Sequence, residues 1–325
     1  MSAEVAAKPA VVIVGAGGMG ALFGAILQNG GLQVTLIDTD AEHVRAIRER
    51  GLKIVGYGGD RTVAIAVTAD ASTVTSADVV LFQCKAHGSR EGAHAISHLL
   101  GGGTAAISFQ NGLGNEQAIA EVVGEGNVLG GLTTMAGQLL EPGVIRDFSR
   151  VPSYIGEMGG GLSSRVRSLA DAFSNAGLET HASDNINRDI WKKLLGNIAT
   201  SALSGITNLT SAECLAVPEL KAISIRALDE ALRVAASQDI HLDRDEALHG
   251  METISRAGGT GDNKSSLCVD LLNQRATEVD FIYGSVIAKG RQASVPTPTL
   301  DTLAAIVRGL ESRYMPLDQS PARAP

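Results

Sequence analysis

One stretch of the sequence combines the spacing of a buried helix with a row of polar side chains that could act on a small ligand. It reads DIWKKLLGNIATSAL and covers residues 189–203. At 3.6 residues per turn, Lys193, Asn197, Ser201 and Ser204 share one side of the expected helix. A lysine can supply a proton, and the amide and hydroxyl groups can hold a polar ligand. The same row could instead be a solvated helix edge, with Lys193 reaching outward.

The motif GAGGMG could bind phosphates, because it lies between a β-branched run and a segment of helical spacing. A strand-to-helix turn of this kind predicts a dinucleotide-binding loop. Gly15 permits the tight turn, Gly17 lets the backbone approach a pyrophosphate, and Gly20 lets strand and helix pack closely. Gly18 and Met19 complete the loop, and we expect them to contact the cofactor as well.

Two charged residues bear on which dinucleotide this loop would take. Asp38 ends the second expected strand, where a carboxylate can accept hydrogen bonds from both ribose hydroxyls and repel a 2′-phosphate. Lys85 follows the fourth expected strand and could meet such a phosphate. Asp38 therefore favours NAD and Lys85 favours NADP, and we give the aspartate more weight.

Asn111 follows the fifth expected strand, in FQNGLGNE, at the carboxyl edge where sheets of this kind bind ligands. Asparagine tolerates positive φ, so it could simply be a turn residue. Alternatively, its side-chain amide contacts the nicotinamide or the substrate.

The elements that must position these residues change character along the chain. Short apolar strands alternate with helical segments in the first half, which predicts a parallel sheet covered on both faces; the strands are expected at 10–15, 32–38, 62–67, 78–84, 103–109 and 127–132. Beyond about residue 184 only helical patterns follow, at 218–238, 265–292 and 298–311. We therefore expect an α/β fold, with a Rossmann-type doubly wound parallel sheet in residues 1–183 and an all-α substrate domain in residues 184–325.

The composition excludes several classes of function. A net charge of −8 and an aromatic content of 3% argue against nucleic acid or an anionic membrane as partner. No apolar run is long enough for a signal peptide or a membrane span, so we expect a cytoplasmic protein. Cys84, Cys214 and Cys268 form no CxxC pair and are expected to be buried thiols. His94 and His98 have no third ligand nearby, so no metal is expected.

Five motifs together resemble one family. VGAGGMG, CKAHG, QNGLGNE, DIWKKLLGN and SSLCVDLLNQRATEVDFIYG occur in the order and spacing of the ketopantoate reductase (2-dehydropantoate 2-reductase) family. The resemblance runs through nearly the whole chain, and RATEVDFIYG is its most distinctive part. It implies an oxidoreductase of pantothenate biosynthesis that reduces a 2-oxo acid, 2-dehydropantoate, to pantoate, with NADPH as the family's usual cofactor.

The same resemblance implies roles for individual residues. Lys193 matches the lysine that bonds the keto oxygen and serves as general acid, and Glu278 matches the carboxylate that works with it and binds the substrate hydroxyl. Ser266 matches a serine that holds the substrate carboxylate, and Asn197 matches a substrate-binding asparagine. Asn111 matches an asparagine near the nicotinamide, and Glu278 is also expected at the cofactor site.

Two departures from the family pattern leave alternatives open. Ser201 stands where relatives often carry asparagine, so one expected substrate contact is shortened. Asp38 stands where members that prefer NADP commonly have a basic or small residue, so NAD and NADP both remain candidates. The main alternative is an NAD-dependent dehydrogenase of the same fold that acts on another 2-oxo or 2-hydroxy acid. A nucleotide sensor without turnover would need neither Lys193 nor Glu278. A homodimer is a further expectation.

Overall fold

The computed structural model describes residues 8–100, 103–256 and 260–315. It forms two compact units. The first comprises Met1–Gln110 and Asn115–Ile186, and the second comprises Asn111–Gly114 and Asn187–Pro325. The N-terminal residues 1–7 and the C-terminal residues 316–325, which the expectations above include, lie outside the described residues.

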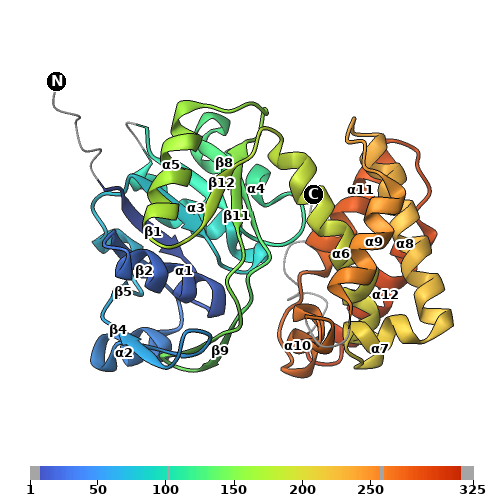
Figure 1. Ribbon diagram of the computed structural model, residues 1–325, viewed down its shortest axis with the longest axis horizontal. Helices are drawn as coiled ribbons and strands as arrows, with labels where there is room; N and C mark the ends of the chain where they lie inside the picture. Colours follow the sequence, from blue (N-terminus) through green and yellow to red (C-terminus); the bar gives the residue numbers. More distant parts are fainter. Residues whose placement is uncertain (1–7, 101–102, 257–259, 316–325) are drawn as a thin grey trace. The chain divides into compact units, whose positions relative to one another are not determined.

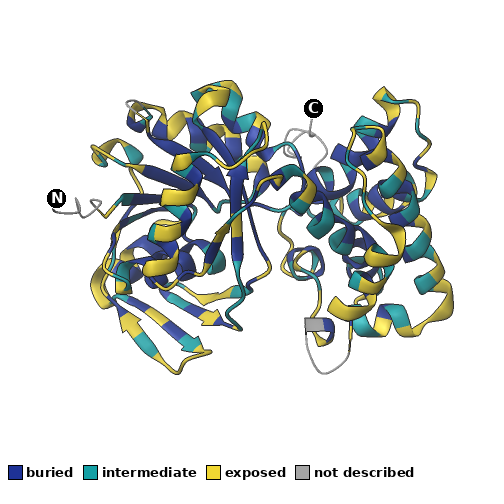
Figure 2. Cartoon of the chain, turned by 45° about the horizontal axis from the view of Figure 1, so that its top comes forward, coloured by how far each residue is buried: buried dark blue, intermediate teal, exposed yellow. Residues whose placement is uncertain are grey.

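The first unit is built on an eight-stranded sheet of order β12-β11-β8-β7-β6-β1-β2-β5 (Figure 1). Neighbouring strands pair in parallel, except that β8 and β11 are antiparallel. The central strands are buried along almost their whole length, as a sheet covered on both faces requires (Figure 2). The strands are β1 (Ala10–Val14), β2 (Gln33–Ile37), β5 (Ala66–Thr68), β6 (Val79–Phe82), β7 (Ala105–Ser108), β8 (Val128–Thr133), β11 (Ser153–Glu157) and β12 (Thr180–Ala182).

Helices cover both faces of this sheet, which confirms the predicted doubly wound α/β fold. One apolar cluster includes Phe23 and Phe173, from α1 and α5, and the other includes Ile96 and Ile119, from α3 and α4. The two clusters take alternate residues of β1, so each face of the strand has its own core. The helices are α1 (Gly18–Asn29), α2 (Ala41–Arg50), α3 (Ser89–Ile96), α4 (Asn115–Val123) and α5 (Ser164–Asn175).

A second, four-stranded sheet of order β4-β3-β10-β9 was not predicted. Its strands are β3 (Leu52–Gly56), β4 (Arg61–Val63), β9 (Gly137–Glu141) and β10 (Val144–Asp147). The prediction of one strand over residues 62–67 is wrong, because β4 pairs with β3 in this small sheet and β5 pairs with β2 in the large one. Helix α1 packs against both sheets.

The second unit is helical, as predicted. Helices α8 and α12 begin at Pro218 and Pro298, since the fixed φ of proline suits the first turn of a helix. The predicted helical stretch 265–292 divides into α10, a π-helical turn and α11. The elements are α6 (Ile186–Thr207), α7 (Ser211–Ala216), α8 (Pro218–Ala236), α9 (Arg244–Ile254), α10 (Ser266–Leu272), the π-helical turn Asp280–Gly284, α11 (Ser285–Gln292) and α12 (Pro298–Glu311).

The cysteine and histidine side chains differ in their surroundings. Cys214 and Cys268 are buried as predicted, but Cys84 is only half-buried. His98 bonds the carbonyl oxygen of Val74 through Nε2 at 2.9 Å. Within the described ranges, no three His, Cys, Asp or Glu side chains are grouped to hold a metal ion. No helix among those residues is long and apolar enough to cross a membrane.

Candidate active site

The glycine-rich loop of the first unit joins β1 to α1, and two of its glycines are required by packing. Gly15 has a φ of +95°, and a Cβ added there would lie 2.4 Å from the backbone nitrogen of Cys84. A Cβ on Gly20 would lie 1.8 Å from the carbonyl oxygen of Gly15. The tight turn and the close approach of helix to strand, both predicted above, therefore explain these two residues.

Gly17 differs from them, because a Cβ there would meet no atom within 4 Å. It precedes α1, which has neither a side-chain cap nor an acidic residue in its first turn. The N–H groups at this helix end can therefore bind an anion, so the loop suits the pyrophosphate of a dinucleotide.

Gly18 instead faces the carbonyl oxygen of Gly137, 2.5 Å from an added Cβ, and Met19 packs on the core. Packing explains these last two residue types.

Ala16 is held on both sides by side chains from the following elements. Asp38 accepts the N–H of Ala16 at 2.6 Å and that of Asp40 at 2.9 Å. The buried His43 lies with Nε2 2.9 Å from the carbonyl oxygen of Ala16, while its Nδ1 accepts the N–H of Gly143 at 3.0 Å. Since Nδ1 accepts, the ring proton must be on Nε2, which donates to Ala16. No motif in the sequence marks His43.

Lys85 and Asp38 lie after the ends of different strands. Lys85 follows β6 and Asp38 follows β2, and β1 lies between them in the sheet. Neighbouring strands are about 4.8 Å apart, so the two backbones are separated by about 10 Å at this edge. Asp38 contacts the loop itself, through the N–H of Ala16.

The second unit brings together three residues that are far apart in the sequence. Asn111 Oδ1 accepts a hydrogen bond from Lys193 Nζ at 2.9 Å, across 82 positions. Asn111 Nδ2 donates to Glu278 Oε2 at 3.3 Å, across 167 positions. An ammonium can only donate and a carboxylate can only accept, so the two partners set which way the amide faces. The asparagine thereby links the lysine to the glutamate.

The backbone around Asn111 corrects one expectation. Positive φ occurs at Gly112 (+85°) and Gly114 (+93°), not at Asn111, so the reading of Asn111 as a positive-φ turn residue is wrong. Leu113 donates its N–H to the carbonyl oxygen of Phe281 at 2.9 Å. A Cβ on Gly112 would lie 2.3 Å from that same oxygen. Gly112, which no motif argument singled out, lets the segment pack directly on the chain that follows Glu278.

The electrostatic environment of Lys193 suits proton transfer. Desolvation by burial lowers its pKa from 10.5 to about 8, and the negative charge of Glu278 opposes this lowering. Glu278 is itself buried, with 5% of its surface exposed. Lys192, one position earlier, is instead a surface residue whose Nζ contacts Glu246 at 2.7 Å. The two adjacent lysines therefore have different environments, and the lowered pKa of Lys193 suits proton exchange near neutral pH.

The remaining candidates lie on α6 and at the start of α10. Asn197 is half-buried, whereas Ser201 and Ser204 are buried, so the solvated-edge alternative is wrong for these serines. Ser265 donates its hydroxyl to the carbonyl oxygen of Ser201 at 3.1 Å and its N–H to Ser204 Oγ at 3.2 Å. The start of α10 is thus bonded to α6, and Ser266, the next residue, is exposed.

Comparison with known proteins agrees with this arrangement over both units. Residues 11–160 match the model for ketopantoate reductase PanE/ApbA, and residues 185–311 match the model for its C-terminal domain. The 2-dehydropantoate 2-reductase of Halobacterium salinarum is 32% identical over 92% of this chain and 97% of its own. That of Pyrococcus abyssi is 30% identical over 93% of this chain and 98% of its own.

Solved structures are equally similar. The ternary complex of D-mandelate dehydrogenase with NADH and anilino(oxo)acetate is 30% identical, covers 94% of this chain and 99% of its own, and has a TM-score of 0.90. A ketopantoate reductase from Ralstonia eutropha is 28% identical with the same coverage and a TM-score of 0.86. Because both units match and the similarity to the relatives extends over nearly their full length, the chain is an enzyme of the ketopantoate reductase family.

Proposed function

We propose that the protein reduces the 2-oxo group of 2-dehydropantoate, with a nicotinamide dinucleotide as hydride source and Lys193 as proton donor. The observation that carries this proposal is the group formed by Lys193, Asn111 and Glu278, in which the lysine pKa is lowered to about 8. An amine of that pKa is protonated at neutral pH and still gives up its proton readily.

Different residues of the second unit are proposed to donate the proton, to position the donor and to bind the substrate. NAD(P)H, when bound, supplies the hydride. Negative charge then develops on the carbonyl oxygen, where Lys193 Nζ can hydrogen-bond it and donate a proton. Asn111 restrains Nζ through its hydrogen bond. The charge of Glu278 favours the protonated form of the lysine, and its carboxylate can accept a hydrogen bond from the substrate hydroxyl. Asn197, one turn after Lys193, and Ser266, exposed at the start of α10, are the proposed contacts to the rest of the substrate.

The first unit is the proposed cofactor domain, with NADH preferred over NADPH. Gly17 and the uncapped start of α1 receive the pyrophosphate. Asp38, at the end of β2, would bond the ribose hydroxyls and repel a 2′-phosphate. Lys85 remains the candidate that would favour NADPH.

A different 2-oxo acid is the second candidate substrate. D-mandelate dehydrogenase, solved with anilino(oxo)acetate, has the same fold at a TM-score of 0.90. Ser201, shorter than the asparagine that relatives often carry, could leave space for another substituent. A nucleotide sensor is not proposed, because it would need neither Lys193 nor Glu278.

The test is to measure oxidation of NADH and of NADPH separately, with 2-dehydropantoate and with phenylglyoxylate as substrates. We expect turnover of 2-dehydropantoate, faster with NADH. Turnover with NADPH alone would support the reaction and contradict the role of Asp38. Turnover of phenylglyoxylate alone would favour the second candidate. Absence of turnover with either acid would contradict the proposed substrates.

A cytoplasmic location and a homodimer also remain predictions. Light scattering at micromolar concentration tests the dimer directly. A mass near 33.6 kDa, that of one chain, would contradict it.

A further inference from the structure

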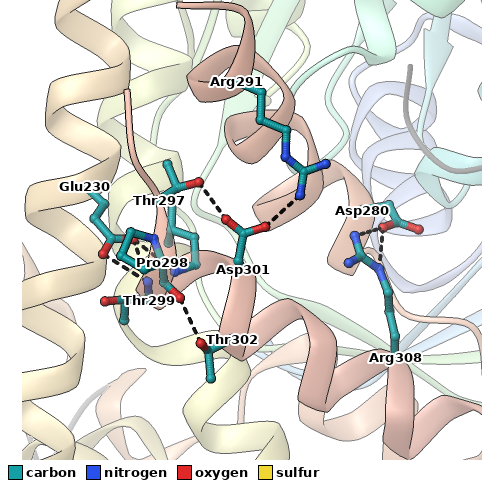
Figure 3. Close-up of polar contacts among 10 residues, drawn as sticks. Glu230, Asp280, Arg291, Thr297, Pro298, Thr299, Asp301, Thr302 and Arg308 are labelled. Carbon is teal, nitrogen blue, oxygen red and sulfur yellow. Dashed lines mark hydrogen bonds and ion pairs between the residues drawn. The ribbon is translucent and has the colours of Figure 1, made fainter. Parts of the chain in front are cut away.

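The π-helical turn Asp280–Gly284 begins two residues after Glu278, and π turns of this kind occur frequently at functional sites. The carbonyl oxygen of Glu278 accepts the N–H groups of Phe281 and Ile282 at 3.1 and 3.0 Å, so Glu278 opens the helical stretch that continues into α11. Helix α12 also holds the turn, because Arg308 donates to Asp280 (Figure 3). The backbone that carries Glu278 is therefore anchored.

Tyr283, within this turn, reaches the backbone of α6. Its side chain is fully buried, and its hydroxyl accepts the N–H of Ala202 at 3.0 Å and donates to the carbonyl oxygen of Ile198 at 2.8 Å. Ile198 and Ala202 are four residues apart, the spacing of the hydrogen bond that closes one turn of an α-helix. A side chain at such a pair is a recognised cause of helix bending. Burial also raises the pKa of the phenol, so the hydroxyl keeps its proton.

The turn of α6 that Tyr283 contacts also carries two proposed substrate residues. Asn197 and Ser201 each precede one of the two bonded residues by a single position, and Lys193 lies one turn earlier. In the same π turn, the carbonyl oxygen of Phe281 accepts the N–H of Leu113, which holds the segment that contains Asn111.

We propose that Tyr283 is a positioning residue for the reduction, which sets the distance of Lys193 and Asn197 on α6 from Glu278 by bridging the Ile198–Ala202 pair. The inference rests on the proposed function and deepens it. Without the hydroxyl, this turn of α6 loses its two hydrogen bonds to the π turn and shifts relative to the chain that carries Glu278. The proton donor and the carboxylate then lose their relative placement although both are present.

The test is Tyr283→Phe, which removes one oxygen atom. Displacements of about 1 Å can cost a hundredfold in rate, so we expect kcat to fall by about tenfold or more. The KM of the 2-oxo acid should rise, while the KM of the dinucleotide stays unchanged. Glu278 raises the pKa of Lys193, so a larger separation should move the alkaline limb of the pH profile to lower pH.

Ser224→Ala is the matched control. The hydroxyl of Ser224, on α8, is buried and donates to the carbonyl oxygen of Ala199 at 2.6 Å, one residue beyond Ile198 on the same helix. Its loss removes a comparable hydrogen bond to α6 from an element that does not carry Glu278. We expect this variant to lower the Tm and to leave kcat, KM and the pH profile unchanged.

Comparison of the two variants distinguishes a positioning role of Tyr283 from a purely structural one. Kinetics and pH profile of Tyr283→Phe that match those of Ser224→Ala would overturn the inference. If Tyr283→Phe does not fold, the comparison is repeated with Tyr283→Met, whose flexible side chain fills similar space. If neither folds while Ser224→Ala does, Tyr283 is required for folding and the inference is also overturned. Wild-type enzyme is measured in the same assay, and its failure to turn over would contradict the proposed function instead.

Discussion

At the residue scale, the two adjacent lysines of α6 offer an internal comparison. We expect Lys193→Ala to lower kcat by roughly two to four orders of magnitude, as for loss of a general acid. Lys192→Ala should be nearly silent, because an exposed ion pair such as that with Glu246 contributes about 0–1 kcal/mol to stability. Steady-state kinetics decide. A Lys193 variant within tenfold of wild type, or a large loss for Lys192, would show that the proton donor is misassigned.

The pH dependence of the reduction should follow Lys193. The donor must be protonated, and burial lowers its pKa from 10.5 to about 8. The rate of reduction should therefore be constant below pH 8 and fall above it, whereas the reverse oxidation, which needs the neutral amine, should rise over the same interval. Glu278→Gln should move the limb to lower pH, since Glu278 raises the lysine pKa. A limb near pH 10.5 would contradict this assignment.

Asp38 should control the choice between NADH and NADPH. Asp38→Asn removes the charge and keeps an oxygen that can accept the N–H of Ala16. We expect the ratio of kcat/KM for NADPH to that for NADH to rise by about tenfold, since charges a few ångströms apart interact by about 1 to 4 kcal/mol. Asp40→Asn is the control, because Asp40 caps α2 and asparagine caps helices equally well. Equal ratios in both variants would contradict a specific role for Asp38.

At the element scale, the segment 111–114 depends on glycine geometry. Gly112→Ala introduces both a strained φ and a contact with the Phe281 carbonyl oxygen, so Asn111 should be displaced and kcat should fall with the Tm. We expect a loss of stability of about 1–3 kcal/mol. Gly114→Ala shares the positive φ but meets no atom within 4 Å, so it isolates strain from contact. Equal losses of kcat in the two variants would contradict the proposed packing.

Much of the large sheet is predictable because its strands are apolar on both faces and alternate with helices. The small sheet is not, since β3 pairs in parallel with β10, about 90 residues later, and the exposed strand β9 shows no apolar pattern. TVAIAV looks like one strand because its apolar pattern does not show that its two ends pair with different strands, β3 and β2. Pairing between distant segments decides both cases.

The candidate site was predictable in part. Asn111, Lys193 and Glu278 follow from the family resemblance, but only the fold shows that one amide contacts the other two side chains. Tyr283 had no signal beyond its apolar surroundings, because a π turn leaves no mark in the residue types. The hydroxyl partner of Ala202 is likewise invisible in the sequence.

At the scale of the whole molecule, pyrophosphate binding is assigned to the first unit and proton transfer to the second. A substitution should therefore be able to remove proton transfer without weakening dinucleotide binding. Lys193→Ala should gain the same Tm increase as wild type on addition of NADH, because the loop residues are unchanged. Saturation at 100 times Kd should stabilise both by about 2.7 kcal/mol. Differential scanning fluorimetry over a range of NADH concentrations measures this. A variant that NADH no longer stabilises would mean that Lys193 takes part in dinucleotide binding.

The four residues Asn111–Gly114 belong to the second unit although their neighbours on both sides belong to the first. A chimera of two relatives joined at Ile186 and Asn187 would therefore take the Asn111 amide from one parent and Lys193 and Glu278 from the other. Exchange of the nucleotide-binding half, the obvious way to re-engineer cofactor use, also exchanges a partner of the proton donor. Such hybrids should retain the native chemistry best when the four residues are inherited together with the helical half.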